Sequence, residues 1–237
     1  RYDNGQTKIN YSDQKDNILI ASETNDGSFS ADRSALASNF VFNISPWDVS
    51  LEGSLFPVPV TFSILALVHN ALLPTTASEG EQKVSIGISI QELAFSEPFW
   101  DRLDPLKIFD RETFNLNLDL EGFIHFMKGY KTAEWTTKNE FDNFYGIAEL
   151  LSLSLNEFAV SGLGAKFSVD GEFSFDNDDY ITFEGIPRPE GDIRLSFKGL
   201  NNVLQKLSTA GVIGSEEVMG AKMLLGMFTV AVGMDEL

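Results

Sequence analysis

The chain has 237 residues, 35 of them acidic and 17 basic, and its formal net charge is −18 at neutral pH. A field of this sign repels phosphate backbones and anionic headgroups, which disfavours both nucleic acid as a partner and docking on a membrane through a basic patch, so we expect no nucleic-acid partner. Cysteine is absent and histidine occurs twice, so disulfides, thiolate chemistry and multi-histidine metal sites are excluded.

Alternation of apolar and polar residues predicts successive strands in the first third of the chain, because neighbouring side chains in a strand point to opposite faces. The apolar residues of three runs each share a parity: Phe40, Phe42 and Ile44; Trp47, Val49, Leu51 and Leu55; Val58, Val60, Phe62 and Ile64. Pro46, Pro57 and Pro59 mark strand starts or edges, since proline cannot donate to the ladder. The polar segment from Thr75 to Gln82 predicts a loop.

The alternation resumes at Val84 and slips by one residue after Ile90, so that Leu93 and Phe95 fall on the other parity. Such a slip predicts a β-bulge. Five further strands are predicted from apolar residues at alternate positions, over 114–126, 151–155, 163–175, 181–183 and 193–197. About ten strands result, all one-sided, which indicates a large antiparallel sheet.

Helical spacing occurs only near the end of the chain. Leu200, Val203, Leu204 and Leu207 lie three and four residues apart, and Ser215 is placed to cap a second helix. The fold class is therefore mainly β: a long, curved antiparallel sheet, open or barrel-like, with a C-terminal helical pair packing on the apolar face. We expect residues 1–237 to form a single elongated domain belonging to a longer chain, with sub-boundaries near 75–82 or 128–145.

The sequence contains no recognisable catalytic or metal-binding motif. We therefore expect a protein that is not an enzyme and has no cofactor or metal. His69 lies in an apolar run and is interpreted as a satisfied core or loop residue, while His125 projects to the polar face of its strand. The cluster Asp176-Asn177-Asp178-Asp179 is interpreted as a hairpin turn, with a calcium site as the alternative. Met219, Met223, Met227 and Met234 are interpreted as core packing, with an adaptable apolar surface as the alternative.

One stretch is distinctive: Ser96-Glu97-Pro98-Phe99-Trp100-Asp101-Arg102-Leu103-Asp104-Pro105, followed by Phe109-Asp110-Arg111 and a strand ending at Gly122. It resembles the signature of an uncharacterised alphaproteobacterial envelope family known only as domain of unknown function 2125. Residues 185–191 and 201–228 resemble the C-terminal portion of that family. The chain departs from the family at Ile108-Phe109-Asp110, where a leucine-proline is typical. More loosely, the repeated strands are similar to the large β-groove proteins of bacterial envelopes that shield lipid tails.

The resemblance implies an exported protein of the periplasm or cell envelope, with its signal or anchoring segment outside this chain and further strands beyond Leu237. In the motif, Trp100 with Asp104 and Pro105 is interpreted as a structural turn, the aromatic ring packing under the sheet and proline fixing the exit backbone. The alternative is acid–base chemistry by Glu97, Asp101 and Asp104.

Two non-enzymatic functions are expected from the surface that these strands build. The first is binding of lipid or another hydrophobe on a curved apolar sheet, since ten one-sided strands need more covering than two helices supply. The second is an accessory subunit that docks on the periplasmic side of a membrane protein complex. For the latter, Tyr130, Trp135 and Phe141 in the polar segment from Lys128 to Asn143 are the candidate contacts.

Overall fold

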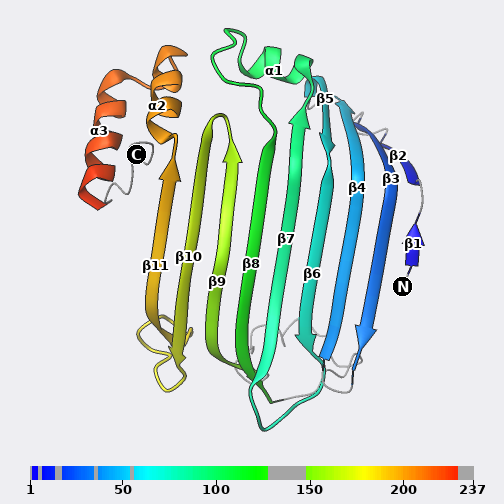
Figure 1. The fold of residues 1–237 in the computed structure, drawn as a ribbon, viewed down its shortest axis with the longest axis vertical. Helices are drawn as coiled ribbons and strands as arrows, with labels where there is room; N and C mark the ends of the chain where they lie inside the picture. Colours follow the sequence, from blue (N-terminus) through cyan, green and yellow to red (C-terminus); the bar gives the residue numbers. More distant parts are fainter. Residues whose placement is uncertain are drawn as a thin grey trace.

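The structure is a computed structural model that describes residues 2–4, 7–13, 18–34, 37–53, 56–127 and 148–228. These residues form eleven strands and three helices (Figure 1). The strands are β1 (Tyr2–Asn4), β2 (Thr7–Asp13), β3 (Ile18–Arg33), β4 (Ala37–Gly53), β5 (Phe56–Ile64), β6 (Ala66–Pro74), β7 (Gln82–Phe95), β8 (Phe114–Phe126), β9 (Ala148–Gly162), β10 (Ala165–Asp176) and β11 (Arg188–Lys198). The helices are α1 (Glu97–Leu103), α2 (Leu200–Thr209) and α3 (Ser215–Phe228).

All eleven strands belong to one antiparallel sheet with the order β1-β3-β4-β5-β7-β8-β9-β10-β11. β2 pairs with β3, and β6 lies between β4 and β7 in line with β5. The predicted fold class, a mainly β protein with a long antiparallel sheet and a C-terminal helical pair, is therefore confirmed. The strands that precede Phe40 were not predicted.

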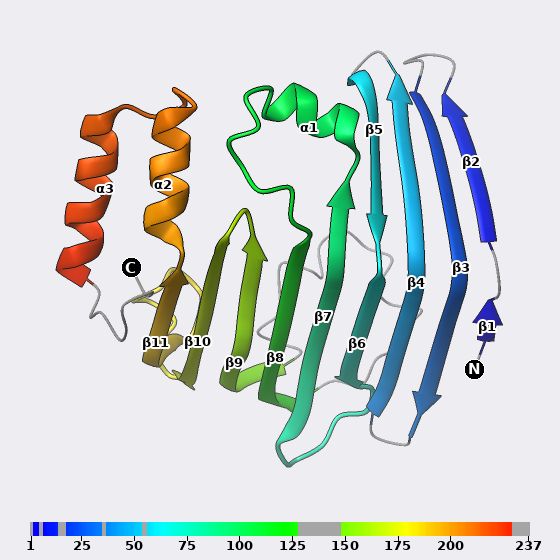
Figure 2. The same ribbon diagram turned by 45° about the horizontal axis from the view of Figure 1, so that its top comes forward.

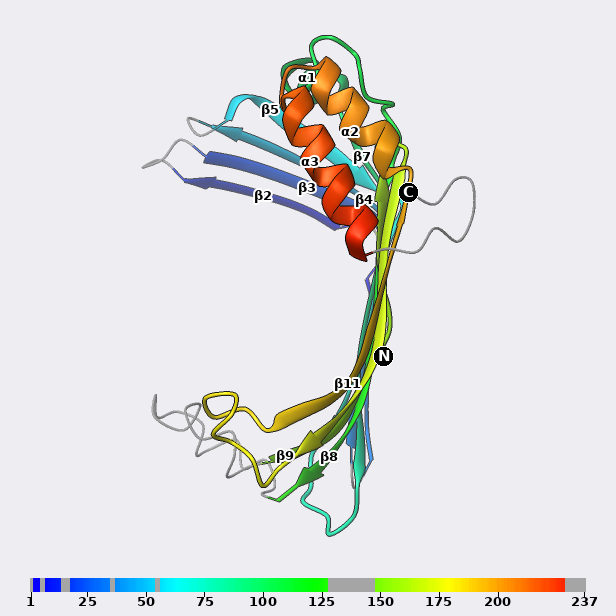
Figure 3. The same ribbon diagram turned by 90° about the vertical axis from the view of Figure 1, so that its left-hand side faces the viewer.

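The sheet is strongly curved rather than flat. In side view both of its ends bend toward the same side, which gives the sheet a C-shaped profile (Figure 3). At the upper end, β2 to β5 turn away from the central strands (Figure 3). Helix α1 lies beside β5 (Figure 2), where the Ser96 amide donates to the Thr61 carbonyl over 2.9 Å. Twist alone does not bend strands along their own length, so bulges and breaks are needed.

One line of breaks crosses the sheet at the upper bend. β7 shows the predicted bulge, a register shift between Ile90 and Leu93, and β5 is separated from β6 at Leu65. At each break the apolar side chains move from even-numbered to odd-numbered positions, yet they stay on the same face of the sheet. The rings of Phe62 and Phe95 demonstrate this, because Phe95 contacts both Phe62 and Phe114, with centroids 6.2 and 5.9 Å apart.

The predicted C-terminal helices are confirmed as α2 and α3. Helix α1 was interpreted as a turn, because seven residues give too few apolar positions to show a helical period. The strand predicted through Ile181 and Phe183 is wrong: that segment forms turns with one isolated bridge between Phe183 and Ile186. Among the described residues, no helix combines the length and the hydropathy needed to cross a membrane.

Candidate hydrophobe-binding face

A row of side chains crosses eight strands on one face of the sheet, each member being the direct cross-strand partner of the next. This central row consists of Phe29, Phe42, His69, Ile88, Leu118, Phe158, Val169 and Leu195. With neighbouring strands about 4.8 Å apart, the row is about 34 Å long. Seven of its eight members are apolar, so the one-sided strands predicted separately join into one continuous surface.

The rows above and below the central row are built in the same way. The upper row consists of Gly27, Ile44, Leu67, Ile90, Leu116, Val160, Phe167 and Phe197. The lower row consists of Ala31, Phe40, Ala71, Ile86, Leu120, Leu155, Gly171 and Ile193. A bulge in β9, where the register shifts between Asp119 and Leu120, keeps Leu155 on the same face as Phe158. In the three rows, called the apolar face below, only His69 has a polar side chain.

The described residues do not cover the apolar face. Only Gly27, Ala71, Val169 and Gly171 are buried there, and the remaining side chains are half-buried or exposed. On β11, Ile193 and Leu195 are 53% and 55% exposed, so α2 and α3 leave this edge open. A sheet face that packs against a second layer is normally closed to water. Among the described residues, therefore, this face has no second layer.

The opposite face is polar and carries ion pairs between neighbouring strands. Lys83 pairs with Glu121 over 2.7 Å, and Arg194 pairs with Asp170 over 2.9 Å. Such exposed pairs contribute about 0–1 kcal/mol each. They nevertheless show that this face of the sheet is suited to contact with water. The exposure of apolar side chains is therefore a property of one face and not of the whole sheet.

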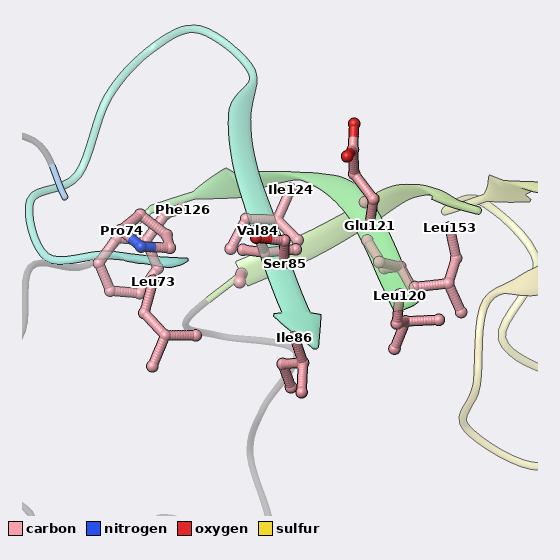
Figure 4. A pocket seen from close by; sticks show the side chains of 13 residues that line it. Leu73, Pro74, Val84, Ser85, Ile86, Leu120, Glu121, Ile124, Phe126 and Leu153 are labelled. Carbon is pink, nitrogen blue, oxygen red and sulfur yellow. The ribbon is translucent and has the colours of Figure 1, made fainter. Parts of the chain in front are cut away.

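A hollow of about 330 Å³ lies on the apolar face at the lower bend, where β6 ends and β7 begins. Figure 4 shows Leu73, Ile86, Leu120 and Leu153 on one side of the strands, while Glu121 points to the other. The hollow makes this part of the apolar face locally concave. Its volume lies at the lower end of the range found for small-molecule sites.

Gly122 permits the close approach of β8 and β9 beside this hollow. A Cβ atom at position 122 would lie 2.6 Å from the Ser152 carbonyl oxygen, a backbone atom that cannot move aside. Gly122 is also buried and opposes Leu153 in the ladder. The glycine therefore belongs to the bend that forms the hollow.

The two histidines lie on opposite faces of the sheet. His69 belongs to the central row, and its Nδ1 atom lies 3.1 Å from the Gly87 carbonyl oxygen. His125 lies on the other side, with Nδ1 3.2 Å from Glu149 Oε2. The structure therefore places His69, but not His125, on the apolar face.

The family-motif residues Trp100, Asp104 and Pro105 lie at the upper end, away from the hollow. Trp100 is 3% exposed and stacks on Phe114 with centroids 6.2 Å apart. Asp104 is also 3% exposed, and its two carboxylate oxygens accept the amides of Ile108 and Phe109 over 3.0 and 2.8 Å. Pro105 follows the helix and is exposed. We call this region the α1 corner.

The carboxylates considered for acid–base chemistry are engaged in this corner. Arg111 bonds to both Glu97 and Asp101, the latter over 2.9 Å. With Asp104 accepting the loop amides, the three carboxylates stabilise the backbone around α1, and none of them lines the hollow at the lower bend.

The aspartate cluster after β10 forms a turn. Asp179 accepts the amides of Ile181 and Thr182 over 3.1 and 3.0 Å and the Thr182 hydroxyl over 2.7 Å. Arg188 lies 3.1 Å from Asp176 and 3.7 Å from Asp179. The bonds from the Thr182 amide and hydroxyl lower the pKa of Asp179 below its usual 3.8. Among the described residues, no group of three or more His, Cys, Asp or Glu side chains is arranged so that it could hold a metal ion.

Tyr130, Trp135 and Phe141, predicted as interaction residues, lie outside the described residues. The residues that sequence reasoning missed are His69 and the members of the three rows as a connected set. Alternation gives the face of each residue within its own strand. The register that places His69 beside Phe42 and Ile88 comes from pairing across the sheet.

Comparison with protein-family models, curated proteins and solved structures finds no match to this chain. The resemblance to domain of unknown function 2125 stays a prediction that rests on its motifs. What is established is the class of architecture: a single curved antiparallel sheet, with one polar face and one apolar face that the described part of the chain leaves uncovered.

Proposed function

We propose that this protein binds the alkyl chains of lipids or similar hydrophobes on its apolar face. The observation that carries the proposal is the uncovered central row, with its concave hollow at the lower bend. Covering exposed apolar area stabilises a complex by about 25 cal/mol per Å². The half-buried leucine, isoleucine and phenylalanine side chains of three rows supply such area in one continuous surface.

The chemistry of the face favours an alkyl ligand over a protein partner. Protein interfaces carry about one hydrogen bond per 100–200 Å² and a polar rim around their apolar centre. Here the three rows offer a single polar side chain, His69, and the hollow is lined by apolar groups such as Leu73, Ile86 and Leu120. An alkyl chain needs no hydrogen bonds, so this surface suits it.

The setting implied by the family resemblance, a bacterial envelope, is part of the same proposal. The acidic balance of the chain supports a carrier or shield that does not adhere to anionic membrane surfaces, because its net charge of −18 repels them. The protein would then act by non-covalent binding, without catalysis or a cofactor.

Native mass spectrometry after purification in mild detergent, followed by lipid extraction, tests the proposal. We expect lipid at fixed stoichiometry on the wild-type chain, and its loss in Ile86→Asp, which places a charge beside the hollow. Ser89→Asp is the matched control, since it introduces the same charge on the same strand but on the polar face. A wild-type chain that carries only a protein partner would contradict lipid binding and favour the accessory-subunit function.

A further inference from the structure

His69 is unusual because it is polar and lies in the middle of the apolar face. Its cross-strand partners are Phe42 and Ile88, and its neighbours along β6 on the same face are Leu67 and Ala71. A histidine at such a position is stable only if its ring nitrogens find partners, since a polar group left unsatisfied in an apolar site is destabilising.

One ring nitrogen is satisfied by the protein itself. Nδ1 lies 3.1 Å from the Gly87 carbonyl oxygen. A carbonyl oxygen only accepts hydrogen bonds, so Nδ1 must carry the proton and donate. In the neutral imidazole the other nitrogen, Nε2, is then an acceptor.

Nε2 has no hydrogen-bond partner among the described residues, and the side chain is only half-buried. In the uncovered protein, water can satisfy this atom. A hydrophobe that covers the central row removes the water, and the cost of an unpaired Nε2 then falls on the complex unless the ligand itself donates a hydrogen bond.

We infer that His69 is the polar recognition point of the apolar face, and that the bound hydrophobe carries a hydroxyl group that donates to His69 Nε2. This inference rests on the proposed function and narrows its ligand class to alkyl chains with a free hydroxyl, such as a fatty alcohol or the glycerol end of an acylglycerol. A ligand with only acceptor atoms does not satisfy an acceptor nitrogen.

The position of the hollow fits such a ligand. Ile86, which lines the hollow, lies one row below the pair formed by His69 and Ile88, about 7 Å along the strand. Leu73, at the far side of the hollow, lies four residues from His69, or about 13 Å. An alkyl chain whose hydroxyl lies at His69 therefore runs along β6 and β7 into the hollow.

Displacement of Nile red from the purified chain by three ligands of equal chain length tests the inference. Dodecanol has the hydroxyl, dodecyl methyl ether lacks the donor, and dodecanoate only accepts. We expect dodecanol to bind about fivefold more tightly than the ether, which corresponds to one neutral hydrogen bond, and dodecanoate to bind more weakly than dodecanol. A preference for dodecanoate would overturn the assignment of Nε2 as an acceptor.

The variant His69→Phe keeps the face apolar and removes the acceptor. We expect it to bind the ether as the wild type does and to lose the preference for dodecanol, while the control His125→Phe on the opposite face retains it. If His69→Phe fails to fold, the imidazole ¹⁵N signals of the wild type give the same answer: dodecanol should shift His69 Nε2 and leave His125 unchanged.

The two proposals fail in different ways. Absence of Nile red binding and of all three ligands from the wild type would overturn the proposed function. Equal binding of dodecanol and the ether, unchanged in His69→Phe, would overturn only the role of His69 and leave a hydrophobe-binding face without polar selection.

Discussion

The α1 corner and the central row are built from similar side chains but differ in how completely they are packed. In the corner, Trp100 is 3% exposed, and the ring centroids of Phe95, Phe99 and Phe114 lie within 6.5 Å of its own. In the central row, Phe29 is 41% and Leu195 55% exposed. The chain is able to close an apolar cluster where a helix lies over the sheet. The openness of the face is therefore a local property and not a failure of packing.

The same contrast holds for polar groups. Asp104 in the corner is buried with both carboxylate oxygens bonded to backbone amides. His69 on the apolar face has one nitrogen bonded to the protein and the other without a partner among the described residues. The protein thus satisfies both oxygens of the buried Asp104, whereas His69 keeps one nitrogen that a ligand can reach.

Replacing the central side chain of the closed region should produce the largest effect. We expect Trp100→Ala to lower the free energy of unfolding by about 3–5 kcal/mol, because it removes a large buried ring and leaves a cavity among its aromatic neighbours. Urea denaturation followed by circular dichroism measures the change.

The matched variant on the open face is Leu195→Ala. We expect a cost of about 1 kcal/mol or less, since a half-exposed leucine has lost only part of its transfer free energy and leaves no cavity. If Leu195→Ala costs as much as Trp100→Ala in the ligand-free chain, then the protein itself covers the face and the comparison fails.

The bend beside the hollow gives a second, smaller contrast. We expect Gly122→Ala to destabilise the chain by about 1–3 kcal/mol, because the new Cβ atom would lie 2.6 Å from the Ser152 carbonyl oxygen and force the two strands apart. Gly80→Ala is the control, since its Cβ would meet only Ser78 Oγ at 3.8 Å. Unfolding free energies of the two variants, together with their affinities for Nile red, test whether the bend also forms the hollow.

Much of the fold could be predicted from local patterns, because strand side chains alternate strictly. The run from Phe114 to Phe126 and the slip after Ile90 both appear in the structure as a strand and a bulge. The helices near the C-terminus were equally visible from residues three and four apart. These features depend on neighbours in sequence, and a single chain displays them directly.

The site was less predictable, because it depends on register. The parity of β9 changes at its bulge, so Leu155 and Phe158 share a face although their numbers differ by three. The pairing of His69 with Ile88 joins residues 19 positions apart through a loop. Sequence alone shows that His69 lies in an apolar run, but not that the run belongs to an uncovered face.

The smallest expected effect concerns Asp179, a carboxylate in the turn after β10 that the fold stabilises in its ionised form. Asp179 has its pKa held below 3.8 by hydrogen bonds from the Thr182 amide and hydroxyl. A lowered pKa means that the folded state binds the proton less readily than the unfolded state. The stabilising contribution of Asp179 is therefore complete above pH 3.8 and disappears as the pH falls through the lower, folded-state value.

We expect Thr182→Val, which removes only the hydroxyl bond, to raise the pKa of Asp179 toward 3.8 in an NMR titration of its carboxyl carbon. The variant should be slightly less stable than the wild type at neutral pH, and this difference should shrink below pH 3.8. A difference in stability that persists unchanged in acid would instead assign the effect of Thr182 to packing, and the turn after β10 would then be held by its backbone bonds and by Arg188 rather than by the ionised carboxylate.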